Sequence, residues 1–150
     1  MDNEKKKNLL QIICSKEHLL KAWKFLNKNN KKSHGLSRET IEDFELNIEA
    51  NLTLISSELA DGTFQFRPNR AAIIKKGGGK FRPLQIPEIR DRVVLKSIAL
   101  ILEEELSDIL AESEGYSFAF QKGLGVKDAV QKMVENYKKE KPIILKADMQ

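Results

Sequence analysis

Residues 71–87, AAIIKKGGGKFRPLQIP, form the stretch that decides the fold prediction. Two short runs that suit strands, Ala71–Ile74 and Lys80–Pro87, flank three consecutive glycines at 77–79. Glycine adopts the positive φ angles that tight turns require, so this pattern predicts an antiparallel hairpin. A further short strand is expected just before it, at Phe64–Arg67, where Pro68 marks a break.

Helical periodicity precedes the hairpin. Apolar residues between positions 9 and 26 suit one or two short amphipathic helices. A single helix is expected over residues 41–59, because its apolar residues recur at steps of three or four. Ser37 is expected to cap this helix, with Leu36 and Ile41 packed against each other across the cap.

Two more helices and a last strand follow the hairpin. The first, over residues 93–110, is apolar on much of its circumference and is expected to be well buried. The second is expected from Val126 to Tyr137, and the strand over Ile143–Asp148. The predicted fold class is therefore α+β.

Composition narrows the class of protein. The chain has 150 residues, 41% of them hydrophobic, and its mean hydropathy is −0.43. It has neither an apolar run of about 20 residues nor a recognisable signal peptide, so we expect a soluble, cytoplasmic protein without membrane contact. A single cysteine, Cys14, excludes an intrachain disulfide, and we expect it to pack within an apolar helical stretch. We expect His18 and His34 to be structural or exposed.

Charge is distributed in blocks. The net charge is only +4, but residues 67–96 hold nine basic and two acidic residues, a local net charge of +7. In the hairpin, four cations would be brought close together, which favours a polyanionic ligand such as a triphosphate: Lys75, Lys76, Lys80 and Arg82. The alternative, a solvated surface turn with long charged arms, stays open from the sequence alone.

Other residues give weaker signals. Asp148 ends an otherwise apolar strand, where a carboxylate suits either a magnesium ligand or a turn. Four arginines flank the hairpin and suit contacts to a nucleic-acid backbone: Arg67, Arg70, Arg90 and Arg92. Three aromatic rings could stack on bases, although packing in a core is the commoner role: Phe66, Phe81 and Phe118.

Taken in order, several segments resemble the N-terminal fingers and early palm of reverse transcriptases, most closely the group II intron and related bacterial type. The segments that carry the resemblance span nearly the whole chain: 18–23, 35–44, 75–87, 90–94, 117–130 and 146–148. The resemblance implies a helical extension over 1–35, a fingers subdomain over 36–141 and the first palm strand of a right-hand polymerase over 142–150.

The resemblance also implies roles for particular residues. Asp148 would be the catalytic carboxylate that binds Mg²⁺, with the carbonyl of Met149 as a further ligand near the nucleotide. Arg82, with Lys75 or Lys76, would hold the triphosphate of a deoxynucleotide. The RNA template and primer would be contacted by a larger set: Arg67, Arg70, Lys80, Arg90, Arg92, Phe118 and Phe120.

Some positions depart from the family pattern. The family often has Asp at the position of Gly77 and Gly at the position of Gln85. It usually has an Arg-Ser pair at the position of Leu124–Gly125. The family's Tyr-x-Asp-Asp motif is absent from these 150 residues, so we expect no polymerisation by them alone. The alternatives are a maturase-like module that binds intron RNA without polymerase activity, and a retron-type or antiviral-defence reverse transcriptase.

Overall fold

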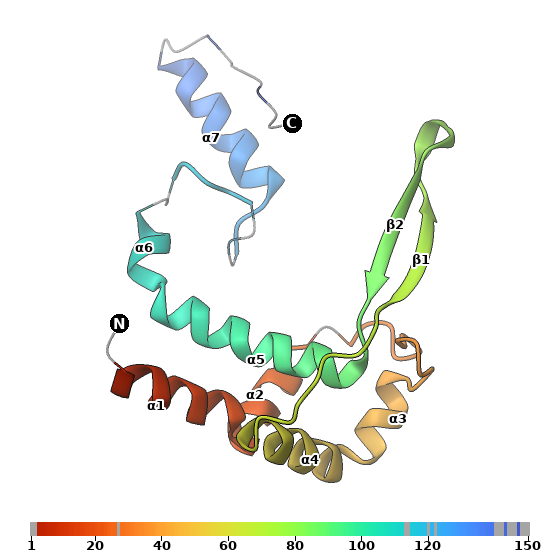
Figure 1. Ribbon diagram of the computed structural model, residues 1–150. Coiled ribbons are helices and arrows are strands. Elements are labelled where there is room, and N and C mark those ends of the chain that lie inside the picture. The colour runs from red at the N-terminus through yellow and green to blue at the C-terminus, as the bar shows by residue number, and fades with distance from the viewer. Residues whose placement is uncertain are drawn as a thin grey trace. The chain divides into compact units, whose positions relative to one another are not determined.

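The computed structural model describes residues 3–26, 28–112, 115–119, 121, 123–139, 143 and 147. The chain divides into two units, Met1–Glu104 and Glu105–Gln150. The described elements confirm the α+β class (Figure 1): α1 (Asn3–Cys14), α2 (Lys16–Phe25), α3 (Ile41–Leu46), α4 (Ile48–Ala60), β1 (Arg70–Lys75), a 3-10 turn (Gly77–Gly79), β2 (Phe81–Ile86), α5 (Ile89–Glu105), α6 (Ser107–Ala111) and α7 (Val126–Lys138).

The core of the first unit is built by α2, α3, α4 and the beginning of α5. Trp23 and Phe44 pack with ring centroids 5.2 Å apart, and the remaining core members are aliphatic: Leu19, Ala22, Ile41, Leu52, Ile55, Ile89, Val93 and Val94. Cys14 and His18 are also buried, and His18 Nε2 lies 3.0 Å from the carbonyl of Ser97. Their predicted structural roles are confirmed.

The segment predicted as one helix over residues 41–59 is two helices. Asn47, with φ −117° and ψ 30°, separates α3 from α4 while the apolar side chains keep their common side. Asparagine suits such a break because its side chain competes with the backbone for hydrogen bonds. The prediction of a single helix is therefore wrong at this residue.

The predicted cap at Ser37 is also wrong. Thr40 caps α3: its hydroxyl accepts from the N–H of Asp43, whose carboxylate accepts from the N–H of Thr40 at 3.0 Å. Ser37 instead donates its N–H and its hydroxyl to Glu88, and Leu36 is 58% exposed. The hydroxyl of Ser37 therefore bonds to a residue distant in the sequence instead of to the start of α3.

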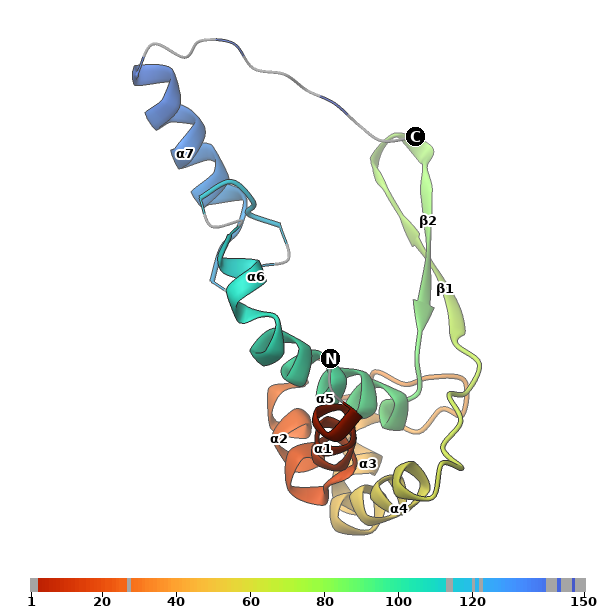
Figure 2. The same cartoon turned by 60° about the vertical axis from the view of Figure 1, so that its left-hand side comes forward.

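The hairpin is present as predicted and projects from the helices of its unit, as both ribbon views show (Figures 1 and 2). The prediction of a strand at Phe64–Arg67 is wrong, since this segment has no regular secondary structure. The N–H of Arg67 donates to Asp91 Oδ2 at 3.0 Å instead of to a neighbouring strand. Phe64 and Phe66 contact each other edge to face, with centroids 5.3 Å apart.

Helix α5 is buried over part of its length only. It begins at Ile89, four residues before the predicted start, and its buried apolar residues are Ile89, Val93, Val94 and Ile101. Leu95 and Leu102 are 48% and 50% exposed, so the helix is well buried on one side only. The prediction of one helix over residues 93–110 is wrong at Leu106, because α5 ends at Glu105 and α6 begins at Ser107.

In the second unit, α7 confirms the helix predicted from Val126 to Tyr137, and Asp128 Oδ2 accepts from the N–H of Gly125 at its start. The predicted strand over Ile143–Asp148 lies outside the described residues, apart from positions 143 and 147. No helix within the described ranges is long and apolar enough to cross a membrane.

Candidate nucleotide and nucleic-acid interface

The hairpin has two chemically different faces, which follow from its register. Ile74 pairs with Arg82 and Lys75 pairs with Phe81. Directly opposed residues of an antiparallel pair share a face, and neighbours along a strand alternate between faces. Arg82 and Lys75 therefore lie on opposite faces.

Lys76 and Lys80 continue this alternation past the ends of the strands. Both have extended backbone angles, and the N–H of Lys76 donates to the carbonyl of Lys80 at 2.7 Å. They share a face with Arg82 and, nearer the base, with Arg70. We call this the basic face of the hairpin: Arg70, Ala72, Ile74, Lys76, Lys80, Arg82, Leu84 and Ile86.

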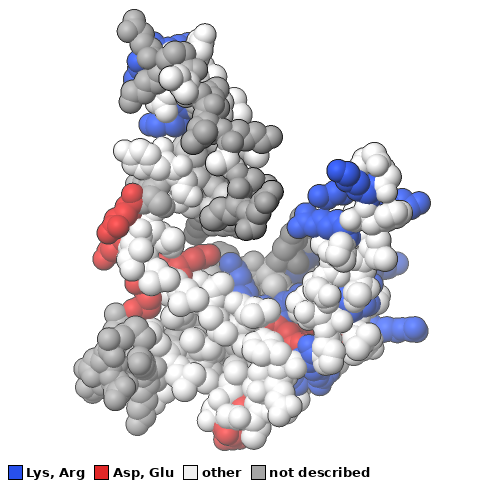
Figure 3. All heavy atoms as spheres, turned by 45° about the horizontal axis from the view of Figure 1, so that its top comes forward, with Lys and Arg blue, Asp and Glu red and all other residues white. Residues whose placement is uncertain are grey.

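The turn keeps the basic face open at its end. Gly78 and Gly79 have φ angles of 72° and 73°, which favour glycine. The side chains of Lys76, Lys80 and Arg82 are exposed, and none of them has an ion-pair partner in the described part of the chain. Figure 3 shows blue Lys and Arg atoms gathered at the free end of the hairpin. Three unpaired cations beside glycine amides are suited to phosphate oxygens.

The base of the hairpin is held by loop 33–37. Arg70 Nε donates to the carbonyl of His34 at 3.2 Å, and Arg92 donates to Ser33 Oγ and to the carbonyl of Pro87, both at 3.0 Å. These bonds connect both ends of the hairpin to the same loop. They give the two guanidinium groups structural partners within the fold, and the predicted RNA contacts of Arg70 and Arg92 stay predictions.

Arg90 is only 9% exposed. It forms an ion pair with Glu58 and lies over the ring of Phe64, 4.6 Å from its centroid. A shallow cavity of about 480 Å³ beside it is also lined by Phe66 and Arg67. Arg67 keeps an exposed side chain there, whereas most of the Arg90 guanidinium is covered, so of the two Arg67 is better placed for a ligand.

Two buried carboxylates, Glu88 and Asp91, organise this region, and neither was among the predicted site residues. Glu88 accepts from the N–H and the hydroxyl of Ser37, both at 2.7 Å. Burial raises its pKa, but hydrogen bonds from Ser37 and from the N–H of Leu36 outweigh burial and leave the pKa below its ordinary value. Burial raises the pKa of Asp91, against the opposing hydrogen bond from Arg67. Their signal in the sequence was that they are the two acids among the nine bases of residues 67–96.

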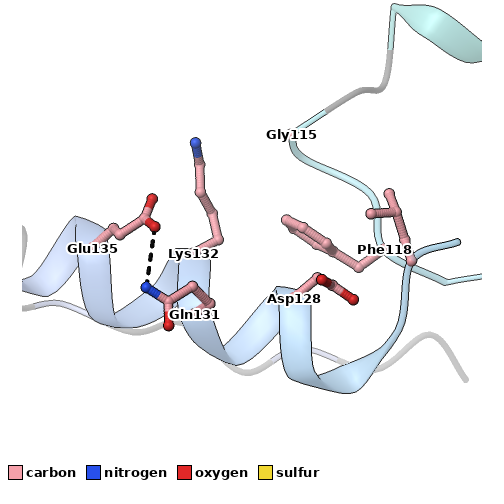
Figure 4. A pocket seen from close by; sticks show the side chains of 7 residues that line it. Gly115, Phe118, Asp128, Gln131, Lys132 and Glu135 are labelled. Carbon is pink, nitrogen blue, oxygen red and sulfur yellow. Dashed lines mark hydrogen bonds between the residues drawn. The ribbon is translucent and has the colours of Figure 1, made fainter.

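The second unit contains a separate cavity of about 300 Å³ between α7 and the loop before it (Figure 4). Phe118 lies on the loop side, and Asp128, Lys132 and Glu135 come from α7. Two carboxylates against one ammonium make this lining unfavourable for phosphate. The predicted RNA contact of Phe118 stays a prediction.

Three predicted site residues, Phe120, Asp148 and Met149, lie outside the described residues. Among the residues that the structure does describe, no group of three His, Cys, Asp or Glu side chains is placed to hold a metal ion. The magnesium site at Asp148 therefore remains a prediction from the resemblance.

No protein-family model matches the chain. It is 30% identical to Protein YkfC of Escherichia coli over 96 residues, which is 63% of this chain and 25% of that protein. It is 27% identical to the Putative COX1/OXI3 intron 1 protein of Saccharomyces cerevisiae over 124 residues, 82% of this chain and 14% of that protein. It is also 27% identical to the Uncharacterized 91 kDa protein in cob intron of Schizosaccharomyces pombe over 128 residues, 85% of this chain and 15% of that protein.

The matched region is thus a quarter or less of each of these relatives. Two of the three are named for introns, and both align over more than four fifths of this chain. The chain is similar to a short part of proteins named for introns.

Proposed function

We propose that this chain is the N-terminal part of an RNA-directed DNA polymerase and that the basic face of the hairpin holds the triphosphate of the incoming deoxynucleotide. One observation carries the proposal: Lys76, Lys80 and Arg82 share one exposed face beside a glycine turn. Cations that repel one another are stabilised by a polyanion between them. The resemblance of this segment to the fingers of reverse transcriptases agrees with that ligand.

We further propose Lys76, and not Lys75, as the lysine that contacts the triphosphate. The sequence left Lys75 and Lys76 as alternatives, but Lys75 shares its face with Phe81, whereas Lys76 shares the face of Arg82. A single triphosphate can contact Lys76 and Arg82 without crossing the sheet. Arg82 can grip two phosphate oxygens with its planar fork, and Lys76 adds a point charge.

The test is primer extension by the full-length protein on an RNA template, with the KM for deoxynucleotide as the readout. Lys76→Gln and Arg82→Gln should each raise this KM about tenfold or more, because a hydrogen bond to a charged group contributes about 1.5–3 kcal/mol. At saturating RNA template, Lys75→Gln is the matched control and should change the KM for deoxynucleotide less than about twofold. An equal effect of both lysine variants contradicts the face assignment, and unchanged KM values in all three contradict triphosphate binding.

We propose Asp148 as a carboxylate ligand of magnesium in the same reaction. When bound, magnesium supplies charge neutralisation and activation of the primer hydroxyl. This part of the proposal rests on the resemblance of the segment at 146–148. Asp148→Asn should abolish DNA synthesis by the full-length protein while leaving its RNA affinity within about twofold.

A second candidate function is an RNA-binding module that assists intron splicing without synthesising DNA. The intron names of two relatives favour it specifically. Under this alternative, Asp148→Asn leaves splicing of a bound intron RNA unchanged, and wild-type protein extends no primer. Measuring splicing and primer extension on the same preparations separates the two functions.

A further inference from the structure

The hairpin face opposite the basic face is apolar and uncovered within its own unit. Ile73 is 73% exposed and Phe81 is 62% exposed, and Pro83 beside them is exposed as well. Among the described residues, no aromatic ring or cation lies over the Phe81 ring. We call this the apolar face of the hairpin: Ala71, Ile73, Lys75, Phe81, Pro83 and Gln85.

The surroundings of this face are strongly basic. Residues 67–87 contain six Lys or Arg residues and no Asp or Glu. Lys75 is the direct cross-strand partner of Phe81, so an ammonium group and a ring rise from neighbouring positions on one face. An exposed ring with a cation beside it is the combination by which proteins hold single-stranded nucleic acid, since the ring stacks on a base and the cation contacts phosphate.

We propose that the apolar face is a second nucleic-acid site, where Phe81 stacks on an unpaired base of single-stranded RNA and Lys75 contacts a neighbouring phosphate. The inference takes its ligand, RNA, from the proposed function, but it uses the face of the hairpin that the triphosphate does not occupy. A stable protein partner would need about 800 Å² of complementary surface, which two large apolar side chains and one proline do not supply. The charge complementarity favours RNA.

Substitutions at Phe81 test the stacking. The probes are a 12-nucleotide oligoadenylate and a 12-base-pair RNA duplex, each titrated into the full-length protein at fixed salt. Phe81→Ala should weaken oligoadenylate binding about 5- to 100-fold, and binding of the duplex should change less than about twofold, because its bases are already stacked. Phe81→Leu keeps apolar bulk but loses the aromatic face, so it should resemble Phe81→Ala.

A gain-of-signal variant keeps the test independent of loss of folding. In Phe81→Trp, we expect oligoadenylate to quench the fluorescence of the new indole, and we expect the affinity for oligoadenylate to be retained. The chain's own Trp23 is 4% exposed and serves as a constant background. Lys75→Gln should lower the dependence of log K on log salt by about 0.7, the effect of one phosphate contact on a single strand.

Three results would overturn the inference. The first is an unchanged affinity of Phe81→Ala for oligoadenylate. The second is wild-type affinity of Phe81→Leu for oligoadenylate, which would indicate an apolar contact without base stacking. The third is indole fluorescence in Phe81→Trp that oligoadenylate does not quench. These readouts differ from those of the proposed function. Loss of oligoadenylate binding in Phe81→Ala, with an unchanged nucleotide KM in Arg82→Gln, would support this site and refute the triphosphate site.

Discussion

Replacing Gly35 with alanine tests how loop 33–37 is held against the hairpin. Gly35 is buried, and a Cβ atom there would lie 2.5 Å from Glu88 Cδ and Oε2 and 2.7 Å from Oε1. Gly35 does not have a positive φ angle, so the glycine is needed for space and not for backbone conformation. The carboxylate of Glu88 would have to move away from the new methyl group.

The cost of that movement follows from the bonds that Glu88 makes. Both of its oxygens accept from Ser37 at 2.7 Å, so displacement weakens one or both bonds. A hydrogen bond to a charged group contributes about 1.5–3 kcal/mol, and overpacking costs about 1–3 kcal/mol. Since the protein will relax partly, we expect Gly35→Ala to lower the free energy of unfolding by about 2–4 kcal/mol.

A double-mutant cycle isolates this clash. In a Glu88→Ala background the carboxylate is gone, so Gly35→Ala should cost less than about 0.5 kcal/mol and give a coupling energy of about 1.5–4 kcal/mol. Urea unfolding followed by the fluorescence of Trp23 measures all four proteins. Gly62→Ala is the matched glycine control, because Gly62 has φ 71° with no atom near its Cβ position and should be insensitive to Glu88. Additive effects of Gly35→Ala and Glu88→Ala, within about 0.5 kcal/mol, would refute the reasoning.

Three further perturbations follow from the same unit. Arg38 has φ 69°, a left-handed conformation that costs a side chain about 1 kcal/mol, so Arg38→Gly should raise the midpoint of thermal unfolding; a lower midpoint contradicts this. The lowered pKa of Glu88 contributes stability that is present above its unfolded value of about 4.3 and is lost as pH falls through the folded pKa. The difference in free energy of unfolding between the wild type and Glu88→Gln should therefore shrink as the pH falls from 6 to 3. A constant difference would contradict a lowered pKa of Glu88. Ser33→Ala removes one partner of Arg92 and should destabilise the first unit by about 1–2 kcal/mol in urea unfolding, whereas no change would mean that this bond contributes nothing.

The hairpin and most helices could be predicted because their signals are local. Three glycines between strand-forming runs determine a turn, and apolar spacing of three or four residues determines a helix face. The cap at Ser37 failed for the opposite reason, since its hydroxyl bonds to Glu88, 51 positions away. The predicted strand at Phe64–Arg67 failed likewise, because Asp91 takes the N–H of Arg67.

The candidate site was predictable as a set of cations but not as an arrangement. The sequence predicts that four cations lie close together in the hairpin: Lys75, Lys76, Lys80 and Arg82. Only the register, in which Ile74 pairs with Arg82, shows that Lys75 lies on the opposite face from the other three. Arg90 illustrates a different limit: a basic residue beside a basic segment suggests RNA, but Glu58 and Phe64 occupy its guanidinium group. Composition cannot distinguish a cation used inside a fold from one left for a ligand.

The two faces of the hairpin connect these points. A change of register by one residue would place Lys75 on the same face as Arg82 and Phe81 on the same face as Lys76, which would disrupt both proposed sites at once. The bonds from loop 33–37 to Arg70 and Arg92 oppose such a change, because they fix the two ends of the hairpin at its base. Under the two proposals, the buried carboxylates Glu88 and Asp91 act on binding indirectly, because they hold the chain segments from which the cations project. Variants that weaken the base of the hairpin should therefore alter nucleotide and single-stranded RNA binding together, whereas Arg82 and Phe81 variants should alter one each.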